Sequence, residues 1–317
     1  MEKVRAGVIG LGLKGYRYDV EGKVRQRPDT HVGALQGNPD VVLVAVCDTD
    51  PEKRAFFSER HPDIPMYDAF EKMLYESKLD LLCIATPVAD HCRLVRLSCR
   101  YLNIKAILVE KPIAETVEQA WSMVHTCAYY KVVLAVNHQR RWDSFWRKAH
   151  SMVTRTVGCP QFAVGLCGGD PVEAGVHMAD LFHWFAPRAQ YRYVDLKGKK
   201  PYDPSIVFDL YLYGPKGKMA IGGNGNWVEP YTLVPSIRWD GLVELVNGPK
   251  LFQEDMKLPL KRREAGAEVG LPYTPMENVV ADLVKCVRTG SKPRCTGADG
   301  VKALQTCLKW APKEVAP

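Results

Sequence analysis

Five short apolar segments, each separated from the next by a helical pattern, constrain the fold of the first half of this chain most strongly. They lie at residues 4–9, 41–47, 79–85, 104–109 and 132–136. The segments are almost continuously apolar instead of alternating, which is typical of parallel strands covered on both faces. Helical patterns lie between them, at about residues 31–38, 51–60, 68–77, 90–102 and 116–130. The alternation predicts an α/β, Rossmann-type doubly wound parallel sheet.

The pattern changes after about residue 136. Helices are expected at 143–156 and around 177–184, and again at 275–289 and 297–310. Between these pairs of helices, closely spaced strand patterns occupy residues 206–213, 218–222, 234–239, 242–246 and 250–252. Such spacing favours a large, mostly antiparallel sheet. We therefore predict two domains, a nucleotide-binding domain at 1–136 and an α+β domain at 137–317.

Composition narrows the class of protein. The 43 basic and 36 acidic residues give a formal charge of +7, but no helix-long basic stripe with interleaved aromatic residues occurs, so nucleic acid is not an expected partner. No segment approaches the ~20 apolar residues of a membrane span, and the N-terminal residues read as a strand and not as a signal peptide. The 10 cysteines include no Cys-x-x-Cys pair. These features predict a cytoplasmic protein in a reducing compartment.

A glycine-rich turn follows the first strand. Gly10, Gly12 and Gly15, with Leu13 and Lys14 between them, fit the pattern G-x-G-x-x-G. Glycines in this position permit a tight turn and let a pyrophosphate approach backbone N–H groups.

An acidic residue, Asp48, ends the second strand. A carboxylate there can bind both hydroxyls of an adenosine ribose and repel a 2′-phosphate. The turn and this acid together predict NAD as the cofactor, in preference to NADP.

A polar stretch at residues 16–29 separates the turn from the helix expected near residue 31. The first turn therefore does not run directly into its helix. The stretch is either a delay before the helix or a flap over the cofactor, and its arginines are interpreted as solvated charges of a surface loop.

Two further strand ends have polar residues. Thr86 and Pro87 follow the third strand, with His91 early in the next helix, and Glu110 and Lys111 follow the fourth. Ligands bind at the carboxyl ends of parallel strands, so Lys111 is expected to face the cofactor crevice. Pro112 permits a cis peptide bond that would set its direction.

Several motifs, in order along almost the whole chain, resemble the glucose-fructose oxidoreductase / inositol dehydrogenase / MocA (Gfo/Idh/MocA) family. They are the glycine-rich turn, Ala-Thr-Pro at 85–87, Val-Glu-Lys-Pro-Ile-Ala at 109–114, Asn-His-Gln-Arg-Arg-Trp at 137–142, the segment 168–180 with its Gly-Gly and His-x-x-Asp, and Asp-Gly at 299–300.

The resemblance implies an NAD(P)-dependent dehydrogenase or reductase that moves hydride to or from a secondary alcohol of a sugar, sugar derivative or cyclitol. Lys111 and His177 match the catalytic pair that relays the proton, with Glu173 as a further catalytic group. The substrate-binding residues implied are Lys111, Asn137, Arg141, Trp142, His177 and Asp180. The cofactor-binding residues implied are Gly10, Gly12, Leu13, Lys14, Gly15, Asp48, Thr86, Pro87, His91, Glu110, Lys111 and Gln139. The family also implies a homodimer or homotetramer.

Two departures from the family pattern concern the substrate site. Glu173 stands where the family has an aspartate, four residues before the histidine, which puts the carboxylate on a longer arm. The stretch 158–169 is shorter than in the family, which predicts either a more open pocket or a pocket that a partner subunit closes.

Other interpretations are weaker or remain as alternatives. A metal site at His177, Asp180 and His183 is not expected, because positions six apart on a helix do not share a face. Phe145 and Trp146 are expected to pack a domain interface instead of lining a sugar pocket. The alternatives to the dehydrogenase are an NAD-dependent glycosidase that uses transient oxidation, and a non-catalytic cofactor-binding sensor or scaffold.

Overall fold

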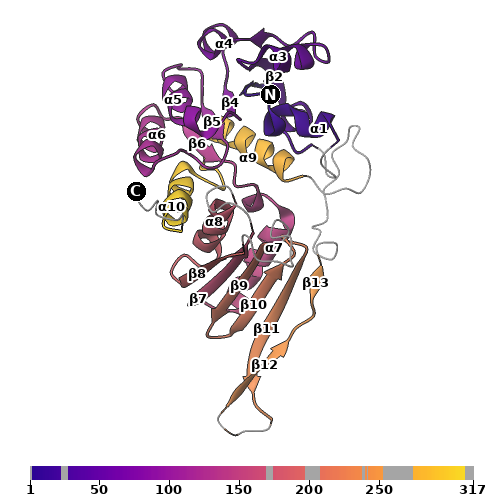
Figure 1. Ribbon diagram of the computed structural model, residues 1–317, viewed down its shortest axis with the longest axis vertical. Coiled ribbons are helices and arrows are strands. Elements are labelled where there is room, and N and C mark those ends of the chain that lie inside the picture. Colours follow the sequence, from indigo (N-terminus) through magenta and orange to yellow (C-terminus); the bar gives the residue numbers. More distant parts are fainter. Residues whose placement is uncertain are drawn as a thin grey trace, which may run out of the picture. The chain divides into compact units, whose positions relative to one another are not determined.

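The computed structural model describes residues 2–22, 28–168, 174–196, 208–237, 240, 242–252 and 274–310. The chain divides into two compact units (Figure 1). The first comprises residues 1–143 and 273–301, and the second comprises residues 144–272 and 302–317. The boundary that we expected after residue 136 lies close to residue 143, where the first unit is interrupted. We had assigned residues 273–301 to the second domain, whereas they belong to the first unit.

The first unit contains a six-stranded parallel sheet in the order β3-β2-β1-β4-β5-β6. Its strands are β1 (Val4–Ile9), β2 (Val41–Cys47), β3 (Met66–Tyr67), β4 (Leu81–Ile84), β5 (Ala106–Val109) and β6 (Val133–Val136). This doubly wound order reverses direction between β1 and β4, where α/β proteins of this class bind dinucleotides. The predicted fold is confirmed, with the two-residue strand β3 as an addition.

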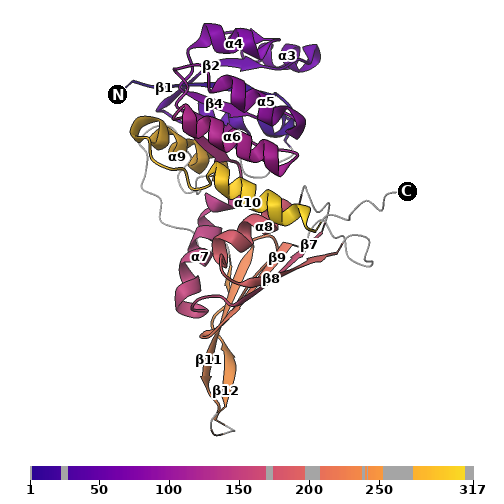
Figure 2. The ribbon, with the colours of Figure 1, turned by 90° about the vertical axis from the view of Figure 1, so that its left-hand side faces the viewer.

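Helices cover the faces of this sheet. They are α2 (His31–Gln36), α3 (Pro51–Ser58), α4 (Phe70–Ser77), α5 (Val88–Ser98), α6 (Val117–Tyr129) and α9 (Pro275–Thr289). Helices α5 and α6 pack together (Figure 2), whereas α9 packs against α2 and contacts β4 and β5. The strands of the sheet are therefore almost fully buried, as their continuous apolar runs predicted.

The segment after the glycine-rich turn differs from our expectation. A π-helix, η1 (Leu13–Arg17), begins directly after Gly12 and continues into α1 (Tyr18–Val20). Helix α2 then begins at His31, with the side chain of Thr30 accepting a hydrogen bond from the Gly33 N–H. The turn thus does run into helical structure, because residues 16–20 of the stretch belong to η1 and α1. Residues 23–27 of the stretch lie outside the described part of the chain.

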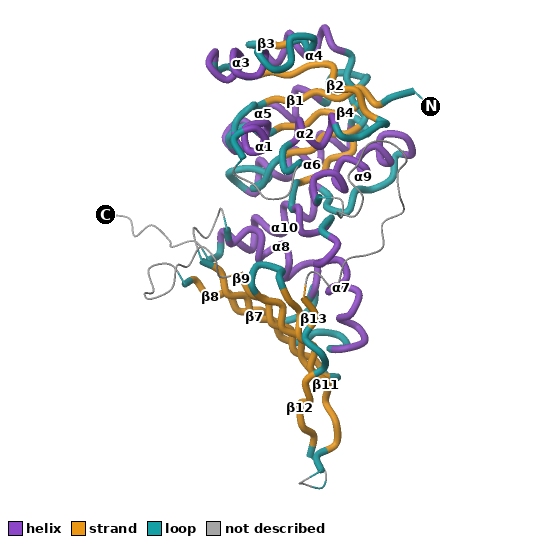
Figure 3. Tube along the Cα trace, turned by 90° about the vertical axis from the view of Figure 1, so that its right-hand side faces the viewer, coloured by secondary structure: helices purple, strands orange, loops and turns teal. Residues whose placement is uncertain are grey.

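The second unit is a mostly antiparallel sheet in the order β12-β11-β10-β9-β7-β8, with β13 paired to β11. Its strands are β7 (Phe162–Cys167), β8 (Gln190–Asp195), β9 (Phe208–Gly214), β10 (Gly217–Gly222), β11 (Trp227–Pro235), β12 (Val243–Asn247) and β13 (Leu251–Phe252). Figure 3 shows these strands in orange. Among the described strands of this second sheet, β7 and β8 are the one pair that runs in parallel, and neither strand was expected.

One expected strand is displaced. We expected a strand at 234–239, but β11 occupies Trp227–Pro235 despite the proline at position 230. The strands that pair with β11 explain why Pro230 is tolerated. On that side of β11, β13 pairs with residues 227–228 and β12 with residues 231–235, so Pro230 lies between the two pairings. A proline is tolerated in a strand where no ladder hydrogen bond requires its missing N–H.

Helices α7 (Ser144–Thr156) and α8 (Gly175–Phe185) pack on the second sheet. The core between them contains Phe145 and Trp146, which are 1% and 3% exposed. Both rings therefore belong to the interior of the second unit, in contrast to the domain interface that we expected. The remaining elements are the 3₁₀ helix η2 (Gln139–Arg141) in the first unit and α10 (Gly297–Leu308), which crosses the division at residue 301.

Candidate cofactor and active site

The three glycines of the turn after β1 have three different roles. Gly10 has φ of +93°, and a Cβ there would lie 2.6 Å from the carbonyl oxygen of Ala85. A Cβ on Gly15 would lie 1.9 Å from the carbonyl oxygen of Gly10, so the helical turn packs closely against the strand end. A Cβ on Gly12 would meet nothing within 4 Å. The turn is therefore tight at both ends and open at its middle, which fits the approach of a pyrophosphate to the backbone.

Asp48 lies directly after β2 and is held against the same turn. One carboxylate oxygen accepts a hydrogen bond from the Leu11 N–H at 2.7 Å, and the other accepts one from the Asp50 N–H at 2.9 Å. Each oxygen has a second lone pair, so the carboxylate can still accept from ribose hydroxyls. Lys53 Nζ lies 4.0 Å from the second oxygen.

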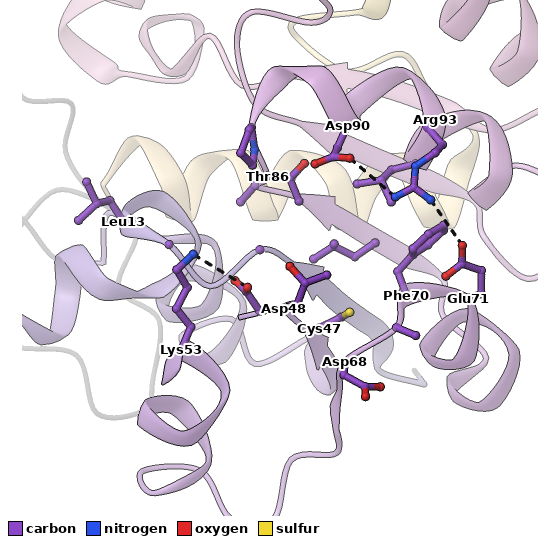
Figure 4. Close-up of a pocket in the computed structure, with 18 residues that line it drawn as sticks. Leu13, Cys47, Asp48, Lys53, Asp68, Phe70, Glu71, Thr86, Asp90 and Arg93 are labelled. Carbon is purple, nitrogen blue, oxygen red and sulfur yellow. Dashed lines mark hydrogen bonds and ion pairs between the residues drawn. The ribbon is translucent and has the colours of Figure 1, made fainter. Parts of the chain in front are cut away.

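A cavity of about 650 Å³ opens where β1, β2 and β4 end (Figure 4). Of the predicted cofactor residues, it is lined by Gly10, Gly12, Leu13, Asp48, Thr86 and Pro87. The hydroxyl oxygen of Thr86 is buried and has no hydrogen-bond partner in the described structure. A buried polar atom without a partner is costly unless a ligand satisfies it, so this hydroxyl also fits a bound cofactor.

The outer part of the cavity contains residues that the sequence did not indicate. The guanidinium of Arg93 lies 4.8 Å from the centre of the Phe70 ring and forms ion pairs with Glu71 and Asp90. Lys53 lines the side near Asp48. The i, i+3 spacing of Asp90 and Arg93 on one helix was visible in the sequence. The contact with Phe70 was not, because it joins two helices.

Glu110 is buried after β5 and connects three segments. Its Oε1 accepts hydrogen bonds from His31 Nε2 at 2.9 Å and from Asn137 Nδ2 at 2.7 Å. Its Oε2 accepts from the Lys111 N–H at 3.3 Å. Burial by itself raises the pKa of Glu110, but the contacts with His31, the Asn137 bond and the charge of Lys14 together lower it to about 2. Glu110 therefore holds these segments together inside the protein, and it does not line the cavity.

Lys111 follows Glu110 at the carboxyl end of β5, and its side chain is half-buried. The Lys111–Pro112 peptide bond is cis, which the proline at this position permits.

His91, a predicted cofactor residue, is buried and contacts backbone instead. Its Nε2 lies 3.0 Å from the carbonyl oxygen of Thr86, and its Nδ1 lies 3.0 Å from that of Pro112. Burial lowers the pKa of its imidazole, partly offset by these carbonyl contacts. The ring thus joins the segment after β4 to the segment after β5, and it does not line the cavity.

Lys14 and Gln139 meet at the end of the 16–29 stretch. Lys14 Nζ lies 2.7 Å from Asp29 Oδ2 and 3.4 Å from Gln139 Oε1. Gln139 donates to the other Asp29 oxygen at 3.3 Å. Asp19 in turn accepts from the Asp29 N–H at 2.8 Å. The two ends of the stretch are therefore fixed by buried and half-buried polar contacts, and Asp19 and Asp29 have a structural role there.

The predicted substrate residues of the segment 137–142 are buried within the first unit. Arg141 lies 3.5 Å from Asp299 Oδ1, and the Trp142 indole donates to Asp282 at 3.0 Å. The Trp142 side chain is fully buried. The Trp142 ring therefore packs inside the first unit, where it has no exposed face on which a sugar could stack. A direct substrate contact for Asn137 or Arg141 stays a prediction.

The other predicted catalytic residues belong to the second unit. His177 lies in the first turn of α8 and is partly exposed, whereas Asp180 is 1% exposed. Glu173 lies outside the described residues. The convergence of Lys111 with His177 stays a prediction, because the two belong to different units.

Across the described residues, no group of three or more His, Cys, Asp or Glu side chains is arranged to hold a metal ion. In the same part of the chain, no helix combines the length and apolar character that crossing a membrane requires.

Residues 4–138 match the profile of the Gfo/Idh/MocA oxidoreductase family, described as an NAD-binding Rossmann fold. The match covers less than half of the 317 residues, and it shows that the first domain is similar to the NAD-binding domain of these oxidoreductases. The match confirms the resemblance read from the motifs, the oxidoreductase class and NAD as the cofactor of the first domain.

Individual relatives extend the comparison. A D-apiose dehydrogenase of Paraburkholderia graminis is 23% identical over 86% of this chain and 81% of that protein. A glycosyl hydrolase family 109 protein 2 of Shewanella sp. (strain ANA-3) is 30% identical, over 40% of this chain and 26% of that protein. The crystal structure of aldose-aldose oxidoreductase from Caulobacter crescentus, complexed with glycerol, has a TM-score of 0.70 at 17% identity and covers 97% of this chain and 96% of that chain. The fold of this oxidoreductase thus extends through both units.

Proposed function

We propose that this protein is an NAD-dependent dehydrogenase or reductase that interconverts a secondary alcohol and a ketone on a sugar, sugar derivative or cyclitol. The observation that carries the proposal is the order of the strand ends. The cavity lies where β1, β2 and β4 end, and Lys111 follows β5, the next strand after β4 in the sheet. A dinucleotide seated in the cavity by its adenosine half would extend toward Lys111.

The glycines of the turn and Asp48 each have a defined role in this proposal. Gly10, Gly12 and Gly15 shape the turn under the pyrophosphate, and Asp48 accepts hydrogen bonds from the ribose hydroxyls. The carboxylate favours NAD over NADP, because a 2′-phosphate would meet a negative charge that is itself fixed by two backbone N–H groups.

The chemistry requires hydride transfer and proton transfer. NAD, when bound, accepts or returns the hydride. In the oxidation the neutral Lys111 amine accepts the proton of the reacting hydroxyl as the carbonyl forms, and in the reduction the Lys111 ammonium returns that proton to the oxygen. His177 exchanges that proton with solvent, and Glu173 and Asp180 orient His177 or the substrate. A positioned acid–base pair of this kind contributes about 10²–10⁴-fold to the rate.

The sugar class is supported by the relatives. One is named for dehydrogenation of D-apiose, and a structural neighbour is named for oxidoreduction between aldoses. Both names concern polyhydroxylated substrates with secondary alcohols. Which sugar this chain uses is a question for a substrate panel.

The test is turnover of a panel of sugars and polyols, followed by nicotinamide absorbance with NAD and NADP side by side. Lys111→Ala and His177→Ala are each expected to lower kcat by about 10²–10⁴-fold, and His177→Ala should leave NAD affinity nearly unchanged. Lys105→Ala is the matched control, because Lys105 belongs to the same domain but forms an exposed ion pair with Asp80. Equal activity of Lys111→Ala and the control would contradict the proposed role of Lys111.

Two alternatives are outcomes of the same panel. The similarity to the family 109 glycosyl hydrolase covers 40% of this chain and 26% of that protein, so it does not by itself favour glycoside cleavage. Release of a sugar from a glycoside without net reduction of NAD would favour the glycosidase. NAD binding with no turnover of any sugar or glycoside would favour the sensor or scaffold.

We also propose that the protein forms a homodimer or homotetramer in the cytoplasm. None of the 10 cysteines forms a disulfide bond, which agrees with a reducing compartment. Paired aromatic side chains are exposed on the second sheet, with Phe162 opposite Tyr213 and 40% and 38% exposed. Light scattering coupled to gel filtration measures the oligomeric state directly.

A further inference from the structure

The buried carboxylate of Glu110 makes three hydrogen-bond contacts in the first unit that the proposed chemistry does not use. It is 8% exposed and lies one residue before Lys111. An ionised carboxylate in such a position is stable only where hydrogen-bond donors surround it. The hydrogen-bond donors around the Glu110 carboxylate therefore show which segments of the chain it connects.

Those donors come from three separate parts of the chain. His31 Nε2 reaches Oε1 from the first residue of α2, and Asn137 Nδ2 reaches the same oxygen from the end of β6. The other oxygen receives the backbone N–H of Lys111 itself. The carboxylate thus connects α2 and β6 to the backbone that carries the Lys111 side chain.

His31 is placed to serve only this contact. Its side chain is fully buried, and its Nδ1 has no hydrogen-bond partner in the described structure. A histidine with one ring nitrogen on a carboxylate and the other in an apolar setting is held in a single orientation by that carboxylate. His31 is the first residue of helix α2 and follows the stretch 16–29. The start of this helix therefore places the imidazole ring beside Glu110.

We infer that His31, acting through Glu110, is a positioning residue that fixes the backbone of Lys111 for the proposed reaction. Asn137 is the second donor of the same arrangement, which gives it a role through Glu110 in place of direct substrate contact. The inference rests on the proposed function for its catalytic consequence, but the positioning contact itself is a property of the protein without substrate.

The test compares His31→Leu, His31→Gln and His61→Leu. Leucine removes the donor at similar size, and glutamine carries a side-chain N–H that can reach Glu110. His61 is the matched control, since it belongs to the same domain but bonds the hydroxyl of Tyr16. Amide hydrogen exchange of the peptide 106–115 is measured in each purified variant without substrate, together with kcat, sugar KM and NAD affinity.

We expect His31→Leu to accelerate exchange in 106–115 by about tenfold, the effect of losing one hydrogen bond to a charged group. It should lower kcat by about tenfold, with sugar KM and NAD affinity within about twofold of the parent protein. In His31→Gln, the exchange rate of 106–115 and kcat should both stay close to the values of the parent protein. His61→Leu should leave the exchange of this peptide unchanged.

Unchanged exchange in 106–115 for His31→Leu would overturn the inference, as would acceleration equal to that of His61→Leu across the whole domain. A normal kcat despite faster exchange would overturn the catalytic part. If the parent protein oxidises or reduces no sugar, the proposed function fails, and the exchange experiment still decides whether His31 positions Lys111.

Discussion

At the scale of single residues, the glycine-rich turn contains positions where the fold itself requires glycine. It also contains one position, Gly12, where the surrounding structure has room for a side chain. Gly10 has a positive φ and a contact distance of 2.6 Å from its absent Cβ to a carbonyl oxygen. Gly12 has φ of −66° and open space beside it. The same residue type thus serves folding at one position and ligand approach at the other.

This difference predicts opposite results for two alanine substitutions. Gly10→Ala should destabilise the first domain by about 1–3 kcal/mol, because it forces a side chain into a strained and crowded position. Gly12→Ala should leave the unfolding midpoint nearly unchanged but weaken NAD binding by about tenfold or more, because its methyl group points into the space used by the pyrophosphate. Thermal denaturation and NAD titration measure the two effects separately. A Gly12→Ala protein that binds NAD normally would show that the cofactor does not approach this turn.

At the scale of elements, local signals define the helices around the site. Thr116 and Gln119 form a capping box at the start of α6, and Thr274 and Glu277 form another at the start of α9. Helix α9 ends at Gly290, which has φ of +67°. These signals explain why the expected bounds of α9 agree with the structure. Helix η1 has no side-chain cap, and its start was not anticipated.

The capping box of α6 gives a prediction for stability. Thr116→Ala should lower the free energy of unfolding by about 1 kcal/mol, since it leaves the Gln119 N–H without its side-chain acceptor. Thr126→Ala is the control, because the Thr126 hydroxyl bonds a carbonyl within the same helix and caps nothing. Denaturant titration compares the two. Equal effects would mean that the cap contributes no more than an ordinary helix surface contact.

At the scale of the whole molecule, the first unit is discontinuous in sequence. Its residues 1–143 are completed by 273–301, which include α9. Met276, Val279 and Leu283 of that helix are fully buried, and α9 contacts α2, β4 and β5. The nucleotide-binding domain therefore obtains part of its core from a segment that follows the second domain in the chain.

A fragment of residues 1–143 should consequently fail to unfold cooperatively, because the apolar surface that α9 covers would be exposed. A chain that joins residues 1–143 to 273–301 through a flexible Gly/Ser linker should fold and bind NAD. Circular dichroism melts and NAD titration distinguish the two proteins. Cooperative unfolding of the shorter fragment would show that α9 is dispensable for the core.

The parts of the site predicted from sequence are those encoded by neighbouring residues. The glycine-rich turn, Asp48 and Thr86 each lie at the end of an apolar strand, and parallel strands bring such ends to one edge. All of them line or border the cavity. His91 and Glu110 lie at the same edge, yet their side chains point into the protein. A residue's place in the sequence indicates its strand end but not the direction of its side chain.

The sequence by itself determined the parallel sheet, the mostly antiparallel second sheet and the cofactor class, because strand periodicity, glycine turns and a strand-end acid are local features. Only the tertiary structure decided that α9 returns to the first unit, that Phe70 and Arg93 meet in the cavity, and that His31 reaches Glu110. Each of these joins residues far apart in the chain. Such contacts depend on which buried surfaces and charges can satisfy one another in the folded chain, and no single segment carries that information.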